Sequence, residues 1–236
     1  MIFYYIRHGD PIYNPDSLTP LGHRQAEAAG RRLSVFGLDK IYASSSTRAI
    51  QTSQPTCEML KKEAEILDFC NEGHAWQEFS TIDEEGNRTW LFHHGETRKL
   101  FAEKEVRDLG HRWTKHPKFT EHQKGIDRIR KESDALFLSL GYEHIPETGK
   151  YKVINGNDQR VALFAHQGFG LAFLSCVLDI PYPQFTLHFD MCHSGITAID
   201  FQEEDGFAYP RVMFLSSDAH LYKEGLPLNY NNEKRV

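Results

Sequence analysis

Short apolar runs alternate with longer segments of helical periodicity along this chain. The short runs are rich in β-branched and aromatic residues, which predicts buried strands at 2–6, 40–44, 66–70, 160–165, 196–201 and 211–215. The longer segments carry apolar or small residues at helical spacing, which predicts helices at 20–36, 47–62, 126–140 and 168–178. Strands that alternate with helices favour an α/β fold, a three-layer α/β/α sandwich around a mostly parallel sheet.

Residues with special backbone preferences mark the ends of these elements. Thr19 and Pro20 are typical of a helix N-cap and first helical position, and Gly37 is typical of the residue that ends a helix. Pro55 predicts an interruption of the second helix, because proline lacks the N–H that the helix needs. The acidic turn that ends in Asp205-Gly206 predicts a connection between the last two strands.

The segment 75–157 differs from the rest of the chain. It is polar, rich in His, Trp and Phe, and carries no strong strand pattern until near its end. No Gly/Ser-rich linker flanks it. We therefore expect a single domain over 1–236, with a helical cap inserted at about 75–157.

Composition and charge exclude several classes of protein. Lys and Arg number 27 against 33 Asp and Glu, a net charge of -6, which argues against a general nucleic-acid binder but not against a pocket for one small phosphate. The four cysteines form no C-x-x-C pair, and we expect them to be reduced thiols. No apolar stretch is long enough for a membrane span or a signal peptide, so we expect a cytoplasmic protein that binds no membrane.

Chemically versatile side chains follow four of the predicted elements. Arg7-His8-Gly9 follows the first strand, Arg48 lies in the first turn of the second helix, Glu72 follows the third strand, and His166-Gln167 follows the strand at 160–165. Taken singly, each has an ordinary explanation: a surface loop, a helix cap, a solvated carboxylate, a core histidine. Together they should meet at one edge of the sheet, where α/β folds bind ligands.

Two arginines and two histidines at one edge suit phosphate chemistry. Guanidinium groups bind phosphate oxygens in bidentate geometry, and neighbouring cations lower the pKa of a histidine. A neutral imidazole in such a pocket can attack phosphorus.

With these residues in view, the sequence resembles the histidine phosphatase superfamily, which includes the cofactor-dependent phosphoglycerate mutases. The matching pieces are R-H-G at 7–9, Asn14, L-T-x-x-G-x-x-Q-A at 18–26, S-S-x-x-R-A-x-Q-T at 44–52, His166, and a closing segment at 217–221. The resemblance implies that His8 takes the phosphoryl group, that Arg7, Arg48 and His166 hold its oxygens with help from Asn14, and that a carboxylate protonates the leaving alcohol. It implies no metal and no cofactor.

The sequence departs from the family pattern in three places. The family acid lies in an E-x-x-x-G-x-W-like segment; here Glu72 is the preferred candidate and Glu78 the alternative. Gln167 stands where glycine is common, which predicts a side chain at the rim of the substrate pocket. Asp10-Pro11 follows R-H-G in place of Glu-Thr or Glu-Ser.

Several alternatives remain open from the sequence. The favoured function is a phosphatase for a small phosphorylated metabolite, with a phosphohistidine intermediate on His8. A phosphoglycerate mutase-type enzyme and a non-catalytic phosphate-binding protein are the alternatives, and a homodimer is one of the oligomeric states left open. Thirteen histidines raise the hypothesis of a metal site, but no H-E-x-x-H or H-x-H motif occurs. The basic and aromatic cap residues, Trp90 and His93 among them, either form a solvated lid or select a substrate with a second anion or a ring.

Overall fold

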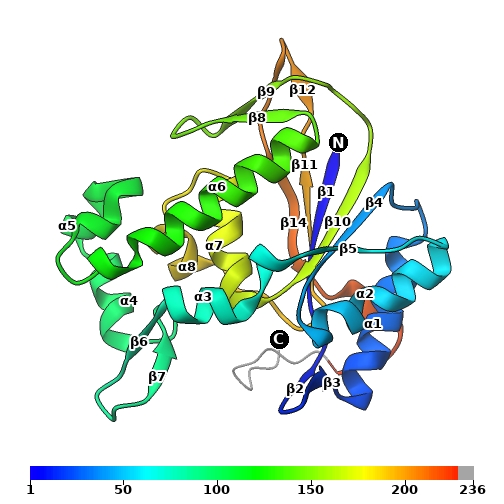
Figure 1. Cartoon of the computed structure of the whole chain (residues 1–236), viewed down its shortest axis with the longest axis horizontal. Coiled ribbons are helices and arrows are strands. Elements are labelled where there is room, and N and C mark those ends of the chain that lie inside the picture. Colours follow the sequence, from blue (N-terminus) through cyan, green and yellow to red (C-terminus); the bar gives the residue numbers. More distant parts are fainter. Residues whose placement is uncertain (228–236) are drawn as a thin grey trace.

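A six-stranded sheet forms the centre of the computed structural model, which describes residues 1–227 (Figure 1). Its strands, in the order β14-β11-β1-β10-β4-β5, are β14 (Arg211–Ser217), β11 (Ile196–Asp200), β1 (Ile2–Arg7), β10 (Arg160–Ala165), β4 (Lys40–Ser44) and β5 (Glu65–Leu67). β1, β10, β4 and β5 pair in parallel, whereas β11 is antiparallel to β1 and β14. The sheet is therefore mostly parallel, as predicted.

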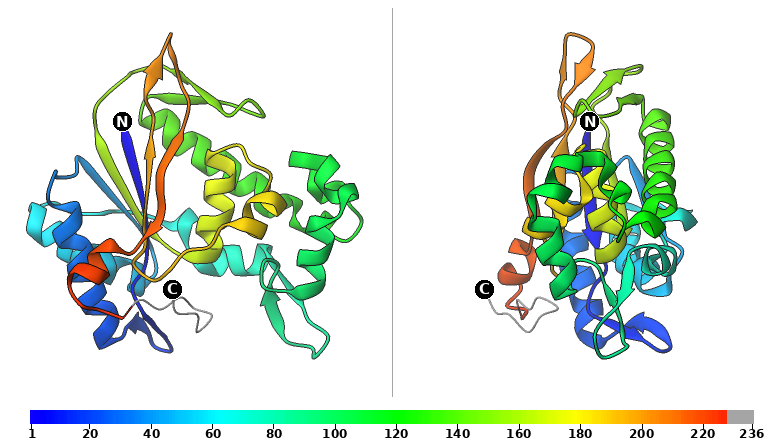
Figure 2. Two further views of the ribbon diagram at one scale, coloured as in Figure 1. Left: turned by 180° about the vertical axis from the view of Figure 1, so that it is seen from behind. Right: turned by 90° about the vertical axis from the view of Figure 1, so that its left-hand side faces the viewer.

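Helices cover both faces of this sheet, which confirms the predicted three-layer architecture. The helices α1 (Pro20–Leu33) and α2 (Thr47–Leu60) lie on one face, with α9 (Ala219–Lys223) beside α1. The helices α6 (Gln123–Ser139) and α7 (Gln167–Val177) lie on the other (Figures 1 and 2).

Successive residues of the central strands belong to different cores, because side chains alternate between the faces of a sheet. On β1, Phe3 and Tyr5 pack into the core under α6 and α7, whereas Ile6 packs into the core under α1. On β10, Leu163 and Phe164 divide in the same way. Both faces are apolar, which explains why these strands are continuous hydrophobic runs in the sequence.

The ends of two predicted elements are wrong. Helix α1 has Ser34 as its C-cap and ends before Gly37, although Gly37 does adopt a positive φ of 74° in the loop that follows. The strand predicted at 66–70 is shorter, because β5 pairs only along the edge strand β4 and the chain then turns into a 3-10 helix (Asp68–Cys70).

Helix α2 is not interrupted by Pro55. The missing proline N–H removes a single intrahelical hydrogen bond. Close packing against α1 accommodates this loss: a Cβ added at Gly30 would lie 3.1 Å from the backbone nitrogen of Thr56. Tertiary contact therefore keeps the helix continuous through a residue that breaks isolated helices.

Part of the segment between β5 and β10 extends away from the sheet (Figure 2). It contains α3 (Glu72–Glu78), β6 (Ser80–Ile82), β7 (Arg88–Trp90), α4 (Gly95–Ala102), α5 (Lys104–Leu109), two 3-10 helices (Gly110–Lys115 and Thr120–His122), α6, β8 (Tyr142–Ile145) and β9 (Lys150–Val153). The β6–β7 hairpin has no counterpart among the predicted elements.

Aromatic side chains give this segment its core. Trp113 stacks on Tyr182 of α8 (Tyr182–His188) at 5.3 Å between ring centroids, and both belong to the same apolar core as Phe3. The predicted single domain also includes residues 228–236, which lie outside the described residues.

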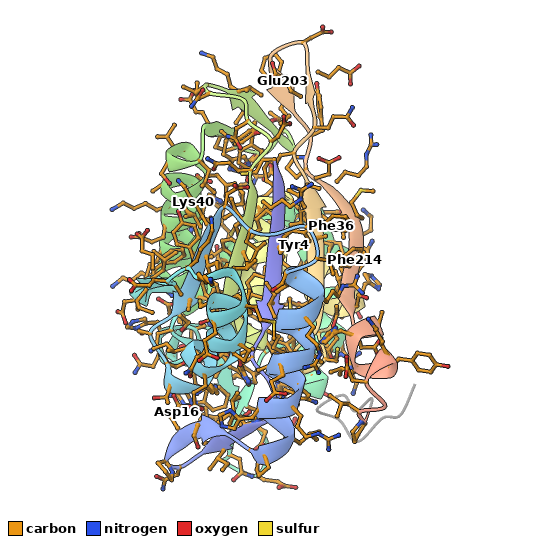
Figure 3. The ribbon with its side chains drawn as sticks, turned by 90° about the vertical axis from the view of Figure 1, so that its right-hand side faces the viewer. Tyr4, Asp16, Phe36, Lys40, Glu203 and Phe214 are labelled. Carbon is orange, nitrogen blue, oxygen red and sulfur yellow. The ribbon has the colours of Figure 1, made fainter. Side chains whose placement is uncertain are left out.

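Two small sheets lie at opposite ends of the central sheet. At one end β12 (Glu203–Glu204), β13 (Phe207–Ala208), β9 and β8 form a four-stranded sheet in that order. Asp205 and Gly206 both take positive φ at the turn between β12 and β13. At the other end β2 (Pro11–Tyr13) and β3 (Asp16–Leu18) form a hairpin; Figure 3 shows Asp16 there and Glu203 far from it.

The structure also bears on the cysteines and on membrane insertion. All four cysteines are unpaired. Within residues 1–227, every helix is too short or too polar to cross a membrane.

Candidate active site

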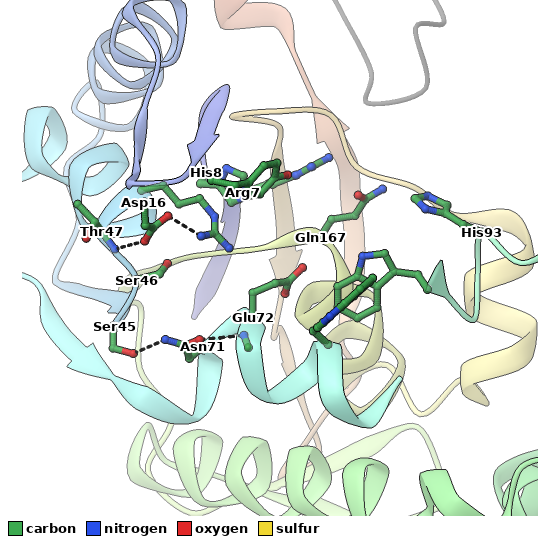
Figure 4. A pocket seen from close by; sticks show the side chains of 15 residues that line it. Arg7, His8, Asp16, Ser45, Ser46, Thr47, Asn71, Glu72, His93 and Gln167 are labelled. Atoms are coloured by element: carbon green, nitrogen blue, oxygen red, sulfur yellow. Dashed lines mark hydrogen bonds and ion pairs between the residues drawn. The ribbon is translucent and has the colours of Figure 1, made fainter. Parts of the chain in front are cut away.

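A pocket of about 840 Å³ opens at the carboxyl ends of the parallel strands, on the side of the β2–β3 hairpin (Figure 4). This is the edge at which α/β sheets bind ligands. The residues that line it are Arg7, His8, Tyr13, Asp16, Ser45, Ser46, Thr47, Arg48, Asn71, Glu72, Gly73, Trp76, Trp90, His93 and Gln167.

His8 follows β1 directly and has a defined tautomer. Its Nδ1 lies 2.7 Å from the carbonyl oxygen of Gly9, and since a carbonyl only accepts, Nδ1 carries the proton and donates it. The lone pair of the neutral ring is therefore on Nε2. Burial, followed by the interaction with His166 and the charges of Arg7 and Arg48, holds the pKa of His8 well below 6.5. The ring is neutral at neutral pH.

Two guanidinium groups flank this imidazole. Arg7 is 1% exposed and donates from Nη1 to the carbonyl of Met191 at 2.6 Å. Arg48 lies in the first turn of α2, where free N–H groups also attract anions. The Nε atoms of both arginines are buried without a hydrogen-bond partner among the described residues. Unsatisfied buried donors at this point suit an anionic ligand.

A carboxylate already contacts Arg48. Asp16, on the β2–β3 hairpin, accepts from Arg48 Nη1 at 2.6 Å and from the backbone N–H of Thr47 at 2.8 Å. The Tyr13 ring, on the same hairpin, lies 5.5 Å from the Arg48 guanidinium carbon. The hairpin therefore covers one side of the arginine.

His166 follows β10, the neighbour of β1, and its ring centroid lies 5.2 Å from that of His8. Its Nε2 is 2.8 Å from Ser44 Oγ and 3.0 Å from Ser46 Oγ. Burial, followed by the charges of Arg48 and Arg7, keeps its pKa well below 6.5. His166 is fully buried and is absent from the pocket lining. The structure thus brings it to His8 but not to the pocket surface.

Glu72 begins α3 and points into the pocket toward Arg7 and His8 (Figure 4). Oε1 accepts from the N–H of Gly168 and Oε2 from the N–H of Phe169, both at 2.9 Å. Burial raises the pKa of Glu72 above 4.5, against the opposing effect of these two hydrogen bonds. A carboxyl group that keeps its proton above the usual range is suited to act as an acid.

The structure separates the two candidate acids. Glu78, at the end of α3, is bound by Arg128 through two contacts of 2.6 Å and does not line the pocket. Only Glu72 of the pair lines the same pocket as His8.

The other two predicted ligand contacts have different outcomes. Gln167 lines the pocket and donates from Nε2 to Asp190. Asn14 is exposed in the turn of the β2–β3 hairpin and does not line the pocket. The hairpin turn carries Asn14 away from the site, and Tyr13 and Asp16 of the two strands line the pocket in its place.

Sequence reasoning missed two side chains of the site, Trp76 and His193. Trp76 follows Glu72 by one helical turn and lines the pocket. Trp90 and His93, for which the sequence left a lid and a substrate-selecting role open, also line it. His193 lies with its ring centroid 5.7 Å from that of His8, and its Nδ1 is 3.5 Å from Asp10 Oδ1. The departure from the family pattern at Asp10 is visible in the sequence and could have indicated altered contacts here. Nothing in the sequence indicates that His193 lies beside it.

His, Cys, Asp and Glu are the side chains that usually bind metal ions in proteins. Within residues 1–227, no group of three or more His, Cys, Asp or Glu side chains is placed to hold a metal ion.

Comparison with known structures shows the fold. A phosphoserine phosphatase variant from Entamoeba histolytica, solved with phosphoserine, is 18% identical with a TM-score of 0.58, covering 93% of this chain and 98% of its own. A mycobacterial glucosyl-3-phosphoglycerate phosphatase is also 18% identical with a TM-score of 0.58, covering 92% of this chain and 99% of its own. At this identity the likeness establishes the fold alone.

Sequence comparison identifies the family. A search of curated proteins found no significant match. The family model described as histidine phosphatase superfamily (branch 1) matches residues 3–123, which is more than half of the chain. That stretch contains Arg7, His8, Arg48 and Glu72. The chain belongs to the histidine phosphatase superfamily.

Proposed function

We propose that this protein hydrolyses a small phosphomonoester through a phosphohistidine on His8. The observation that carries the proposal is the locked imidazole: Nδ1–H is held by the Gly9 carbonyl, so that Nε2 keeps its lone pair in a pocket with two arginines. Such an arrangement has a nucleophile and an anion-binding site in one place.

In the first step, His8 Nε2 attacks phosphorus and the bond from phosphorus to the ester oxygen breaks. Glu72 gives its proton to the departing oxygen, which leaves as a neutral alcohol. Arg7 and Arg48 bind the non-bridging oxygens and stabilise the charge on the transferring phosphoryl group. His166 acts as a positioning group, since it contacts Ser46 of the pocket wall but does not itself reach the pocket.

In the second step, the Glu72 carboxylate takes a proton from water, and the water oxygen attacks the phosphohistidine. The bond from nitrogen to phosphorus breaks, phosphate leaves, and His8 returns to its neutral tautomer. The proton that Glu72 gave to the alcohol is thereby recovered from water, so the residue ends the cycle as it began.

Hydrolysis of an aryl phosphate in EDTA, by the wild type and by His8→Ala, tests the proposal. We expect turnover by the wild type and none above background by His8→Ala, with circular dichroism showing that the variant is folded. Turnover by a folded His8→Ala protein would contradict the mechanism. A wild type that is active only with a bisphosphorylated primer would indicate a mutase, and one that binds vanadate without turnover would indicate a binding protein.

A further inference from the structure

The pocket has an aromatic wall at the end away from Asp16. Trp76 from α3 and Trp90 from β7 meet edge to face, with ring centroids 4.8 Å apart and planes at 74°. Both line the pocket, and both are partly exposed. In Figure 4, His93 and Gln167 lie on this side of the pocket and Asp16 and Thr47 on the opposite side.

This wall is held in place from behind. The Trp90 ring stacks on Phe92 at 5.4 Å and 21°. It also lies against the start of α7, where a Cβ added at Gly168 would come within 2.3 Å of the indole. The same Gly168 N–H binds Glu72. The aromatic wall and the proposed acid are therefore built on one helix terminus, next to the position of the leaving group.

The aromatic end of the pocket contains no fixed cation. Arg7 and Arg48 are the only Lys or Arg residues that line the described pocket, and both lie at the phosphoryl end. Partial burial lowers the pKa of His93, although Asp190 opposes the shift, so this imidazole is not a fixed positive charge. Arg128 of α6 is bound to Glu78, and Arg98 of α4 is near enough to lower the pKa of His93 but does not line the pocket.

The acidic side chains at this end lie within the electrostatic reach of Arg7. Glu72 lies in the pocket and Asp190 contacts Gln167. Glu72 is protonated when it acts as the acid, so a leaving group that carries a carboxylate would bring a second negative charge close to Asp190, while Arg7 and Arg48 bind the phosphoryl group. Like charges at close range disfavour binding, whereas apolar ring faces gain from burial against indole.

We propose that the leaving group of the substrate is an uncharged alcohol with a ring, which packs against Trp76 and Trp90. The inference rests on the proposed function in one respect, that the pocket takes a phosphomonoester. It decides between the two selective roles open to the cap, a second anion or a ring, in favour of the ring. It also distinguishes this chain from enzymes whose substrates are phosphoserine or a phosphoglycerate ester.

Substrates with leaving groups of similar basicity test this selectivity without bias from chemical reactivity. Phenethyl phosphate supplies an aromatic ring, glucose phosphorylated at its primary hydroxyl a sugar ring, glycerol phosphate no ring, and phosphoserine and phosphoglycerate a carboxylate. We expect kcat/KM for one or both ring esters to exceed that for glycerol phosphate by about tenfold. The carboxylate esters should fall below glycerol phosphate. A carboxylate ester as the best substrate would overturn the inference.

Two variants of the wall and one of the rim provide a second measurement. Trp90→Leu and Trp76→Leu should reduce the ratio of kcat/KM between the preferred ring ester and glycerol phosphate by about tenfold. His93→Arg should raise the ratio between phosphoglycerate and glycerol phosphate. Tyr222→Ala, which removes an aromatic ring that is 79% exposed on α9, is the matched control and should alter neither ratio. Unchanged ratios in both folded Trp variants would contradict the inference.

Binding separates failure of this inference from failure of the proposed function. Two of the three tryptophans line the pocket, while Trp113 is buried in the cap, so indole fluorescence reports on the aromatic wall. The wild type is titrated with benzylphosphonate and with phosphonoacetate, neither of which can be hydrolysed as an ester. Tighter binding of benzylphosphonate supports the ring even if no ester is turned over. Equal binding, or tighter binding of phosphonoacetate, overturns it even in an active phosphatase.

Discussion

Asp16 Oδ1 lies 2.6 Å from Arg48 Nη1 at the mouth of the pocket. The other oxygen of Asp16 accepts from the first backbone N–H of α2. A carboxylate from the β2–β3 hairpin thus contacts the two groups, a guanidinium and a helix N-terminus, that would bind a phosphate oxygen. Phosphate must share these groups with Asp16 or displace it.

Replacement of Asp16 tests this competition. Asp16→Asn removes the negative charge but keeps an oxygen that can accept from Arg48, so we expect phosphate to inhibit at about threefold lower concentration. Asp16→Ala lacks that oxygen and should lose the gain, because Arg48 is no longer oriented. Product-inhibition constants for the three proteins measure the effect. An Asn variant that binds phosphate no more tightly than the wild type would show that Asp16 only positions Arg48.

The opposite pKa shifts of His8 and Glu72 predict activity across the pH range between their two pKa values. His8 must be neutral to attack, and its pKa lies well below 6.5, so activity should persist into acidic solution. Glu72 must be protonated to assist a poor leaving group, so kcat/KM should fall as pH rises through its pKa, which burial raises above the ordinary value.

Glu72→Gln tests the assignment of the falling limb. With an alkyl phosphate we expect a loss of about 10²- to 10³-fold in kcat/KM and the disappearance of the alkaline decline, because no proton is available at any pH. With a nitrophenyl ester the rate of bond cleavage should fall much less, since that leaving group needs no acid. Equal losses for both esters would remove Glu72 from the role of proton donor.

Tyr5 supports the site from within the core. Its hydroxyl donates to the carbonyl of His166 at 2.6 Å and accepts from the His166 N–H at 3.1 Å. Tyr5→Phe leaves these buried backbone groups with one partner fewer, and we expect a loss of about 1–3 kcal/mol in unfolding free energy together with lower kcat. Tyr42→Phe is the matched control, because Tyr42 is also buried but makes no side-chain hydrogen bond within the described residues. Identical effects of the two changes would contradict a specific role for Tyr5.

A buried group of charged side chains in the cap predicts that the protein loses stability as the pH becomes alkaline. His144 Nδ1 lies 2.8 Å from Asp134, and Nε2 lies 3.6 Å from Asp179, which also faces His111. Burial lowers the pKa of His144, but the hydrogen bond with Asp134 and the charges of Asp134 and Asp179 outweigh it and raise the pKa to about 9. The imidazole is therefore charged in the folded protein at neutral pH.

Because the folded pKa exceeds the ordinary value of 6.5, the contribution is complete below about pH 6.5 and is lost as pH rises through about 9. We expect His144→Gln to cost about 1–2 kcal/mol near pH 6 and much less near pH 10. Thermal unfolding of both proteins at the two pH values measures this. An equal difference in Tm at both values would assign the loss to packing on Tyr151 rather than to charge.

The parts of the site that could be predicted are those that depend on local sequence. His8, Arg48 and His166 each follow a strong strand pattern or begin a helix, and parallel strands place such residues at one edge. Glu72 could be selected over Glu78 because it comes sooner after the strand. These positions follow from chain order and strand direction alone.

The parts that could not be predicted depend on contacts between distant segments. Trp90 reaches the pocket through the β6–β7 hairpin, whose pattern is too polar and too short to predict strands. His193 comes within reach of His8 only when β11 pairs with β1. Asn14 was expected at the phosphate because of the motif, but the tight hairpin places it in solvent.

Pre-steady-state hydrolysis of a nitrophenyl phosphate by Glu72→Gln tests the central claim most directly. The good leaving group allows His8 to be phosphorylated, while loss of the base slows attack by water, so the intermediate should accumulate. We predict a burst of nitrophenol equal to the enzyme concentration, with one phosphoryl group on His8 when the protein is denatured in base and analysed by mass spectrometry. A linear time course with no burst, or a phosphoryl group on any other residue, would contradict the account.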